Sequence, residues 1–375
     1  MQEIRIALFG VGGYAVNYPI AMARPSREGV RLVGAVDPYS KACDLCPVYD
    51  TAEELFASCR PDLAIIATPI HCHAAQAETS FRHGCHVLLE KPLAPDMAGV
   101  RRILAARDQA GKMLGVGFNL CASSTVRALR ADAKAGLFGR PLRLRAMVLW
   151  PRDHAYYHRG SGWAGRKYTP DGEPVFDSVL SNATAHYLMN MLYLLDEPLA
   201  NLDCATFRAN AIETYDTAVL KGCTASGAEV FIAASHAVDP DITQNPVFRY
   251  EYERATLTFG GKGVTGSRFV AHFADGGVKD YGLVDLSGQQ PLWNMIDAIR
   301  GDDEIACPGE TAMLHVDTIE KMRRLQPEAA AFPEGWKLEK RGFTCVPGLA
   351  EALYQCFDLC ELPRWNLAAE RLVNP

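Results

Sequence analysis

Near its start the chain reads Ile4-Arg5-Ile6-Ala7-Leu8-Phe9-Gly10-Val11-Gly12-Gly13-Tyr14-Ala15, an apolar run that leads directly into a glycine-rich turn. A continuous apolar run predicts a strand that is buried on both faces, as in a parallel sheet. Gly10, Gly12 and Ala15 form G-x-G-x-x-A, in which the first glycine permits a tight turn and the second lets the backbone approach a pyrophosphate. A helix after the glycines would present its amino end to that pyrophosphate. The stretch therefore predicts the first strand and turn of a dinucleotide-binding fold.

Strand-like and helix-like patterns alternate through about the first 120 residues. Strand–helix alternation with continuous apolar strands predicts a doubly wound parallel sheet, and hence an N-terminal Rossmann domain. The predicted strands are residues 4–9, 30–36, 63–67, 86–89 and 114–118, and the predicted helices include 52–57, 73–83 and 95–110.

The pattern changes after residue 120, where we place the boundary between two domains. Apolar and polar residues alternate, and turn signals such as Ala225-Ser226-Gly227-Ala228 and Asp275-Gly276-Gly277 separate the runs. This predicts an α/β domain with a large, mainly antiparallel sheet. Its predicted strands are residues 142–150, 217–224, 229–236, 248–259, 269–273 and 278–281, with helices at about 183–195 and 311–324.

The composition argues against several classes of protein. The chain has 375 residues and a formal net charge of -6, with 38 basic and 44 acidic residues. A nucleic-acid or anionic-membrane surface needs a concentrated basic patch, so we expect neither partner. No run approaches the roughly 20 apolar residues of a membrane span, and no secretory leader pattern is visible. We expect a cytoplasmic protein.

Twelve cysteines are scattered through both halves of the chain. In a reducing compartment they are expected to be small buried hydrophobes rather than disulfides. Cys43 and Cys46 form a CxxC, but a zinc site needs a second pair, and His71 and His73 likewise lack two further ligands at suitable spacing. We therefore predict no metal site.

Asp37 ends the second predicted strand, where a carboxylate can accept hydrogen bonds from ribose hydroxyls. The same carboxylate would repel a 2′-phosphate, so NAD is favoured, although Lys41 keeps NADP open as the less favoured cofactor. Thr68 and Pro69 end the third strand at the edge of the cofactor crevice. The predicted cofactor contacts are Gly10, Gly12, Gly13, Tyr14, Ala15, Asp37, Thr68, Pro69, His73, Glu90, Lys91 and Asn119.

Glu90-Lys91-Pro92 follows the predicted strand 86–89. Ligands of open α/β sheets bind at the carboxyl ends of the strands, so Lys91 is expected near a nicotinamide and a reacting oxygen. Glu90 would pair with the lysine ammonium or hold the turn, and Pro92 fixes the local backbone. The alternative is an ordinary surface lysine after a strand.

Asn182 and His186 are four residues apart and would share one helix face. A histidine is a natural proton acceptor near neutral pH, which makes His186 a candidate base. The alternative is a structural histidine.

Together these motifs resemble the Gfo/Idh/MocA family of nicotinamide-dependent oxidoreductases, which act mostly on sugars, inositols and related polyols. The matching residues are Gly10-x-Gly12-x-x-Ala15, Asp37, Thr68-Pro69 with His73, Glu90-Lys91-Pro92, Gly117-Phe118-Asn119 and the His186 helix. The resemblance implies an NAD-binding domain over residues 1–120. It implies a substrate-binding and oligomerisation domain over residues 121–375, with an open sheet that forms a homodimer or homotetramer. It also implies that Lys91 and His186 surround the reacting hydroxyl.

Two features depart from the family pattern. The family often has Asp-x-Gly-x-His, whereas this chain has Asn182-Ala183-Thr184-Ala185-His186. The amide oxygen of Asn182 can orient the imidazole, but it offers no negative charge to stabilise an imidazolium. Proton transfer would then be weaker, or would use Asp177 or a tyrosine. Leu120-Cys121-Ala122 also lacks the arginines that are common there, which would alter the substrate contacts.

Residues 150–168 are rich in Trp, Tyr, Arg and His. Aromatic faces and cations suit a sugar, and a guanidinium suits a carboxylate such as that of a uronate. The candidate substrate residues in this segment are Arg152, Tyr156, Trp163 and Arg166. The alternative is a structured surface loop or an oligomer contact.

Three functions remain open from the sequence. The leading hypothesis is an NAD-dependent dehydrogenase that oxidises a secondary alcohol of a sugar, inositol or related polyol. The second is an enzyme that retains NAD and oxidises a sugar transiently, as a glycosidase or an epimerase. The third is a non-catalytic NAD or sugar sensor, which has no need of an acid–base pair such as Lys91 and His186.

Overall fold

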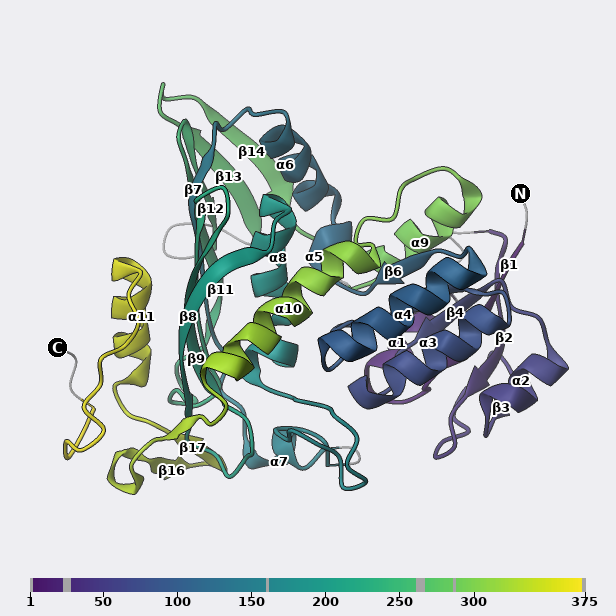
Figure 1. Ribbon diagram of the computed structural model, residues 1–375, viewed down its shortest axis with the longest axis horizontal. Helices are drawn as coiled ribbons and strands as arrows, with labels where there is room; N and C mark the ends of the chain where they lie inside the picture. The colour runs from purple at the N-terminus through teal and green to yellow at the C-terminus, as the bar shows by residue number, and fades with distance from the viewer. Residues whose placement is uncertain (1–2, 23–27, 160–161, 261–266, 286–287, 373–375) are drawn as a thin grey trace. The chain divides into compact units, whose positions relative to one another are not determined.

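A computed structural model describes residues 3–22, 28–159, 162–260, 267–285 and 288–372 (Figure 1). The chain forms two compact units. The first comprises Met1–Ser123 and Asp285–Val316, and the second comprises Ser124–Val284 and Asp317–Pro375. The N-terminal segment of the first unit thus ends three residues beyond the predicted boundary at residue 120. The segment 285–316, which the prediction had assigned to the second domain, packs with the first unit.

The first unit contains a sheet of six parallel strands, of which β1, β2 and β5 have the predicted bounds. In spatial order the strands are β3 (Val48–Tyr49), β2 (Val30–Val36), β1 (Ile4–Phe9), β4 (Leu63–Ile66), β5 (His86–Leu89) and β6 (Leu114–Val116). The order reverses between β1 and β4, which is the point where ligands bind in doubly wound sheets. The turn after β1 is therefore at the switch point.

Helices cover both faces of this sheet. Its helical segments are η1 (Gly13–Val16), α1 (Asn17–Met22), α2 (Ala52–Ser58), η2 (Ile70–Cys72), α3 (His73–Arg82), α4 (Met97–Ala110), α5 (Asn119–Ala122), α9 (Gln290–Arg300) and the first part of α10 (Gly309–Leu325). Apolar side chains of α1 and α9 share one core with β1, β2 and β4. α9 was not predicted, because nothing local in the sequence indicates that residues 290–300 return to the first sheet.

The second unit contains a mixed, mainly antiparallel sheet of nine strands that is open at both edges. The strand runs predicted near β7, β9, β10, β13 and β14 are present. In spatial order the strands are β14 (Val278–Leu283), β13 (Arg268–Phe273), β12 (Ala255–Phe259), β11 (Gln244–Tyr252), β7 (Pro141–Leu149), β10 (Glu229–Ser235), β9 (Thr217–Thr224), β8 (Leu199–Arg208) and β15 (Ala330–Ala331).

One local prediction for this sheet was wrong, and one strand was missed. The run 248–259 was expected to be a single strand, but it divides into β11 and β12. The backbone N–H groups of Glu253 and Arg254 donate to the Arg140 and Phe138 carbonyls, which turns the chain between the two strands. β8 was not predicted, because its exposed and half-buried polar residues interrupt the apolar alternation.

The two faces of the large sheet are covered by different elements of its unit (Figure 1). α8 (Ala185–Leu195) packs on one face, and α11 (Leu349–Leu359) packs on the other against β7 and β10. α11 and the residues around Phe332, Trp336 and Trp365 build an apolar core on that second face. The chain's own C-terminal segment therefore covers part of one face of this sheet, and the homo-oligomer stays a prediction.

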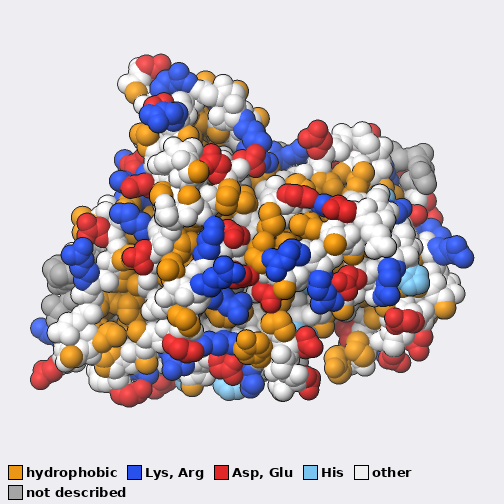
Figure 2. All heavy atoms as spheres, viewed as in Figure 1, with side chains coloured by type: hydrophobic (Ala, Val, Ile, Leu, Met, Phe, Trp, Pro, Cys, Tyr) orange, Lys and Arg blue, Asp and Glu red, His pale blue; other side chains and the backbone are white. Residues whose placement is uncertain are grey.

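The other elements of the second unit are α6 (Ser124–Lys134), α7 (His154–Tyr157), the π-helical turn η3 (Val179–Ala183), η4 (Glu334–Trp336), β16 (Leu338–Lys340) and β17 (Phe343–Cys345). In the described part of the chain, no helix is long and apolar enough to cross a bilayer. On the face shown in Figure 2, Lys and Arg side chains are interspersed with Asp and Glu.

The described residues form no disulfide, and the Cys43 and Cys46 sulfur atoms lie 3.7 Å apart. Burial raises the pKa of Cys46 to about 12, so this thiol stays protonated at neutral pH. Within the described residues, no cluster of three or more His, Cys, Asp or Glu side chains could hold a metal ion.

Candidate functional site

The predicted cofactor residues lie beyond the carboxyl ends of parallel strands of the first unit, at one edge of its sheet. Gly10 follows β1 with a φ of +85°, and a Cβ there would lie 3.0 Å from the Ala67 carbonyl oxygen. Only glycine fits this turn without strain. At Gly12 and Gly13, by contrast, an added Cβ would meet nothing within 4 Å. The turn therefore packs tightly against β4 on one side and leaves open space on the other.

Asp37 follows β2 and is tied to the glycine-rich turn. One carboxylate oxygen accepts a hydrogen bond from the Val11 N–H at 3.0 Å, and the other accepts from Tyr39 and Ser40 at 2.9 and 3.0 Å. These bonds hold the carboxylate, which is half-buried, beside the turn. A carboxylate has about four lone-pair sites, so it retains capacity to accept a ribose hydroxyl.

His73 connects two of the predicted site segments. It is 1% exposed, and its ring nitrogens lie 3.0 Å from the Thr68 and the Pro92 carbonyl oxygens. Burial lowers the pKa of His73 to about 4, although both carbonyl acceptors favour the charged form. The imidazole thus joins the turn after β4 to the Lys91–Pro92 turn, whose peptide bond is cis. This geometry favours a positioning role for His73 over the predicted direct contact with a cofactor.

We expect His73 to make folding less favourable in acid. Its folded pKa of about 4 lies below the unfolded value of 6.5, so between these values only the unfolded chain gains the proton. Stability should therefore fall as the pH drops from about 6.5 to about 4, by up to about 1.4 kcal/mol per pH unit from this group. Urea unfolding across this range should give a shallower pH slope for His73→Gln than for the wild type. Equal slopes would contradict the assignment.

Glu90 is held inside the first unit rather than presented to a ligand. It is 9% exposed, accepts a 2.6 Å hydrogen bond from the Tyr18 hydroxyl of α1, and accepts a 3.2 Å bond from the Lys91 N–H. Burial raises the pKa of Glu90, and the Tyr18 hydrogen bond and the Lys91 charge oppose that rise. Glu90 therefore holds the turn that carries Lys91, which was one of the two predicted roles. Lys91 itself is half-buried.

Gly117 makes room for the Glu90 carboxylate. A Cβ at position 117 would lie 2.9 to 3.0 Å from the three carboxylate atoms. We therefore expect Gly117→Ala to displace Glu90 from Tyr18 and to cost about 1–3 kcal/mol, the price of an unsatisfied buried polar group. Thermal unfolding should show a lower midpoint. Gly335→Ala is the control, because a Cβ there meets nothing within 4 Å and should leave the midpoint almost unchanged.

The remaining first-unit candidates are Tyr14 and Asn119. Tyr14 is 49% exposed, and its hydroxyl donates to the Gly288 carbonyl at 3.3 Å. Burial and the charge of Glu90 raise the pKa of Tyr14, so its phenol is neutral. Asn119 begins α5 after β6, and its buried Oδ1 atom has no hydrogen-bond partner among the described residues. That acceptor is available to a ligand at the carboxyl edge of the sheet.

In the second unit, Asp177 lies beside Asn182. The carboxylate is 3% exposed, and it accepts hydrogen bonds from the Gly165 N–H and from the Asn182 side-chain amide, both at 2.8 Å. Asn182 lies in the π-helical turn η3, and His186 is the second residue of α8, which follows directly. The structure thus brings a negative charge next to the asparagine that departs from the family pattern. His186 is half-buried.

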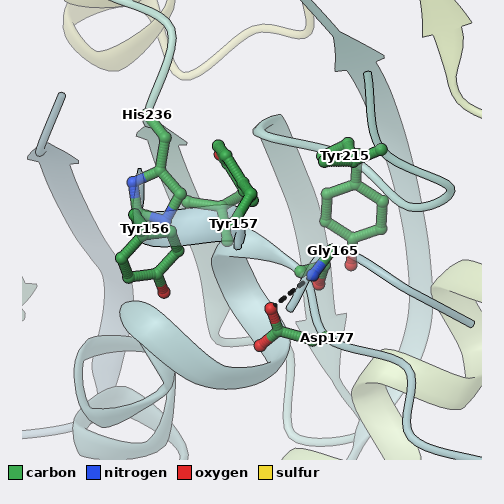
Figure 3. A pocket seen from close by; sticks show the side chains of 9 residues that line it. Tyr156, Tyr157, Gly165, Asp177, Tyr215 and His236 are labelled. Atoms are coloured by element: carbon green, nitrogen blue, oxygen red, sulfur yellow. Dashed lines mark hydrogen bonds between the residues drawn. The ribbon is translucent and has the colours of Figure 1, made fainter. Parts of the chain in front are cut away.

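The segment after β7 supplies the walls of a small pocket in the second unit (Figure 3). The space between atoms there is about 180 Å³, part of which is open solvent, and the lining side chains leave no cavity large enough for a water molecule. Its lining comprises Tyr156, Tyr157, Gly165, Asp177, Ser178, Val179, Ile212, Tyr215 and His236.

The predicted substrate residues of this segment differ in their surroundings. Tyr156 lines the pocket, and Arg152 stacks on it, with the guanidinium carbon 4.8 Å from the ring centroid. Trp163 is half-buried and contacts Arg159, whereas Arg166 is exposed. The structure therefore brings Arg152, Tyr156 and Trp163 into one cluster and does not bring Arg166 into it.

Sequence reasoning missed Tyr18 and His236 and did not single out Arg159. Tyr18 bonds to Glu90 across 72 residues of sequence, and His236 approaches the Trp150 carbonyl across 86. No local pattern could have indicated either contact. Arg159 lay within the basic and aromatic segment, but its neighbours there were indistinguishable by composition alone.

Comparison with known proteins gives one family match. Residues 4–118 match the profile of an oxidoreductase family, GFO_IDH_MocA, described as having an NAD-binding Rossmann fold. The chain is 29% identical to 1,5-anhydro-D-fructose reductase from Ensifer adhaerens over 37% of its own length and 41% of the relative's. It is 26% identical to inositol 2-dehydrogenase from Burkholderia cenocepacia over 64% of its own length and 70% of the relative's. The matches to the first three relatives span 41% to 44% of those relatives' length.

Solved structures share the fold over most of the chain. The WlbA dehydrogenase from Bordetella pertussis, in complex with NADH and UDP-GlcNAcA, is 24% identical with a TM-score of 0.72. An oxidoreductase from Agrobacterium radiobacter, in complex with NAD+, L-tartaric acid and magnesium, is 19% identical with the same TM-score of 0.72. Each match covers 86% of this chain and 96% of the solved one. At these identities the likeness establishes the fold.

Proposed function

We propose that this chain is an NAD-dependent dehydrogenase. The basis is the match of its Rossmann domain to the Gfo/Idh/MocA family of oxidoreductases. The proposed reaction oxidises a secondary alcohol of a sugar, an inositol or a related polyol. The observation that carries this proposal is Lys91, which follows β5 at the carboxyl edge of the sheet where the glycine-rich turn also lies. Relatives named as inositol dehydrogenases and a sugar reductase support the substrate class.

The residues of the first unit fit an NAD molecule. The space beyond Gly12 and Gly13, where an added Cβ meets no atom, suits the pyrophosphate. Asp37 is fixed beside the turn and would accept a hydrogen bond from the adenosine ribose while its charge disfavours a 2′-phosphate. Thr68 and Pro69 follow β4 and Asn119 follows β6, the two strands on either side of β5, and all three would line the cofactor crevice.

The bound nicotinamide would supply the hydride acceptor, and the protein would supply binding, orientation and proton transfer. His186 would accept the hydroxyl proton of the substrate. Lys91 would donate a hydrogen bond to the same oxygen and stabilise the negative charge that develops on it. Glu90, held by Tyr18, and His73, held between two carbonyls, would keep the lysine turn in position.

Asp177 would compensate for the asparagine at position 182. The Asn182 amide N–H₂ donates to Asp177 at 2.8 Å, which fixes the plane of the amide and leaves its oxygen as an acceptor. That oxygen would orient the His186 imidazole four residues later, and the nearby carboxylate would favour the imidazolium. The pair Asp177 and Asn182 would together do what a single aspartate does in the common family pattern.

The test is NADH absorbance at 340 nm after the purified chain is mixed with NAD and a panel of polyols, neutral sugars and sugar acids. We expect NADH formation with at least one class. Silence across the panel, with NAD binding confirmed by calorimetry, would contradict the dehydrogenase. Cofactor that stays bound through purification, together with that silence, would instead support an enzyme that recycles its own NAD. NAD binding with no turnover of any sugar would support a sensor.

A further inference from the structure

Two arginines flank one tyrosine in the segment after β7. The Arg159 guanidinium carbon lies 3.5 Å from the centroid of the Tyr156 ring, and that of Arg152 lies 4.8 Å from it. Each guanidinium also faces a tryptophan, Trp163 at 5.2 Å and Trp150 at 5.6 Å. We call Arg152, Arg159 and Tyr156 the arginine clasp. Stacking on aromatic rings fixes the planes of both guanidinium groups.

Within the described part of the chain, the positive charges of the clasp have no ion-pair partner. Among the described residues, neither Arg152 nor Arg159 has a carboxylate oxygen within 4.0 Å. The neighbouring Asp153 instead caps α7, where it accepts a 2.9 Å bond from the Tyr156 N–H. Two like charges near one ring repel each other, so an anion bound between them would stabilise the cluster.

The two carboxylates that act electrostatically on Tyr156 and Tyr157 are occupied elsewhere. Asp177 accepts bonds from Gly165 and Asn182, and the fully buried Asp216 accepts bonds from the N–H groups of Ala209 and Asn210. Neither is an ion-pair partner of the clasp. Both carboxylates lie near Tyr156 and Tyr157, but they accept hydrogen bonds from backbone N–H groups and, at Asp177, from the Asn182 amide.

The clasp retains hydrogen-bond donors. Stacking uses the faces of the guanidinium groups and leaves their edges free to donate. The buried Arg152 Nε–H has no hydrogen-bond acceptor among the described residues. The Nη1 group of Arg159 donates to the Tyr156 backbone carbonyl at 2.5 Å. The edge of a guanidinium matches a planar carboxylate, to which it can donate two parallel bonds.

His236 adds an acceptor next to the clasp. Figure 3 shows this ring beside Tyr156, and the two ring centroids are 5.7 Å apart. Burial lowers the pKa of His236 to about 3, so the ring is neutral, and Nδ1 donates to the Trp150 carbonyl at 2.8 Å. Nε2 then carries a lone pair that can accept a hydrogen bond. His236 is only 3% exposed, and no group in the described chain donates a hydrogen bond to Nε2. This lone pair suits a hydroxyl of a ligand.

The clasp is connected to the region of His186. The Trp150 ring, which faces Arg152, makes an edge contact with Tyr187 at 5.5 Å, and Tyr187 follows His186 in α8. Tyr156 and Asp177 also line the same small pocket. Side-chain contacts therefore link the clasp to the helix that carries the candidate base.

We propose that Arg152 and Arg159 bind a carboxylate carried by the substrate, which makes the substrate an acidic sugar of the uronate or aldonate class. The assignment of this anion to a substrate rests on the proposed dehydrogenase function. The binding of an anion by the clasp is independent of that function. Arg152 determines specificity, and Arg159 both binds the anion and holds Tyr156.

The experiment compares sugar acids with their neutral parents. D-glucuronate, D-galacturonate and D-gluconate are titrated by calorimetry against the full chain saturated with NADH, which cannot accept a hydride and so allows no turnover. D-glucose, D-galactose and D-glucose 6-phosphate are titrated beside them. We expect at least one acid to bind 10-fold or more tightly than its parent. Arg152→Met should reduce that affinity about 10- to 100-fold, the loss of a charge-assisted bidentate contact, and barely change neutral binding. Arg364→Met, which changes an exposed arginine elsewhere in the second unit, should leave both unchanged.

Equal or weaker binding of every acid than of its parent would overturn the proposal, as would unchanged acid binding in Arg152→Met. Tighter binding of D-glucose 6-phosphate than of any sugar acid would overturn the carboxylate assignment. NADH formation with neutral sugars only would support the proposed dehydrogenase function and contradict the proposal of an acidic substrate. Binding of a sugar acid that depends on Arg152, with no NADH formed, would support anion binding by the clasp and contradict the dehydrogenase function.

Discussion

Replacement of Lys91 by alanine is expected to lower kcat about 10²- to 10³-fold while the dissociation constant for NAD changes less than about twofold. The reason is that the ammonium would act on the oxygen where charge develops, and one such donor is worth about this factor. Its place after β5, at the carboxyl edge of the parallel sheet, supports that role. The measurement is steady-state NADH formation, with NAD binding followed separately by calorimetry.

Lys112→Ala is the matched control for this prediction. Lys112 precedes β6, and so it lies at the amino end of a strand of the same sheet, opposite to the edge where ligands bind. We expect wild-type turnover from this variant. Full activity in Lys91→Ala, or equal losses in both variants, would refute the role of Lys91. A large loss of NAD affinity in Lys91→Ala would instead make the lysine a cofactor contact.

The second large effect is expected at His186. His186→Ala should lower kcat about 10²- to 10⁴-fold, the usual contribution of a general base, and added imidazole should restore part of the rate. His272→Ala removes an exposed histidine of β13 in the same unit and should keep full activity. Unchanged turnover in His186→Ala would move the proton acceptor elsewhere, and Asp177 would be the next candidate.

Asn182→Asp separates the two possible meanings of the departure from the family pattern. It restores the common aspartate, but it places a second carboxylate against Asp177, whose oxygen lies 2.8 Å from the present amide nitrogen. Two carboxylates at that distance cannot both ionise readily. We therefore expect lower activity and a lower unfolding midpoint from this change. A gain of activity would show that Asp177 does not compensate for Asn182.

Much of the cofactor edge was predictable, because each of its signals is local. Gly10, Asp37 and Lys91 directly follow strands whose apolar runs are visible in the sequence, and parallel strands bring their carboxyl ends to one edge. The family profile, described as an NAD-binding Rossmann fold, matches residues 4–118 and so agrees with the predicted fold of this domain. The individual contacts of these residues with a cofactor and a substrate stay predictions.

By itself the sequence determined the doubly wound sheet, its glycine turn and the position of a lysine and a histidine on their elements, because periodicity and turn chemistry act within a few residues. Only the tertiary structure decided the roles of their neighbours. It buried Glu90 against Tyr18, set Asp177 against Asn182 and stacked two arginines on Tyr156. Some of these contacts join residues that are distant in sequence, and others involve one of several similar side chains in a segment. Both kinds depend on tertiary packing, which no local sequence pattern encodes.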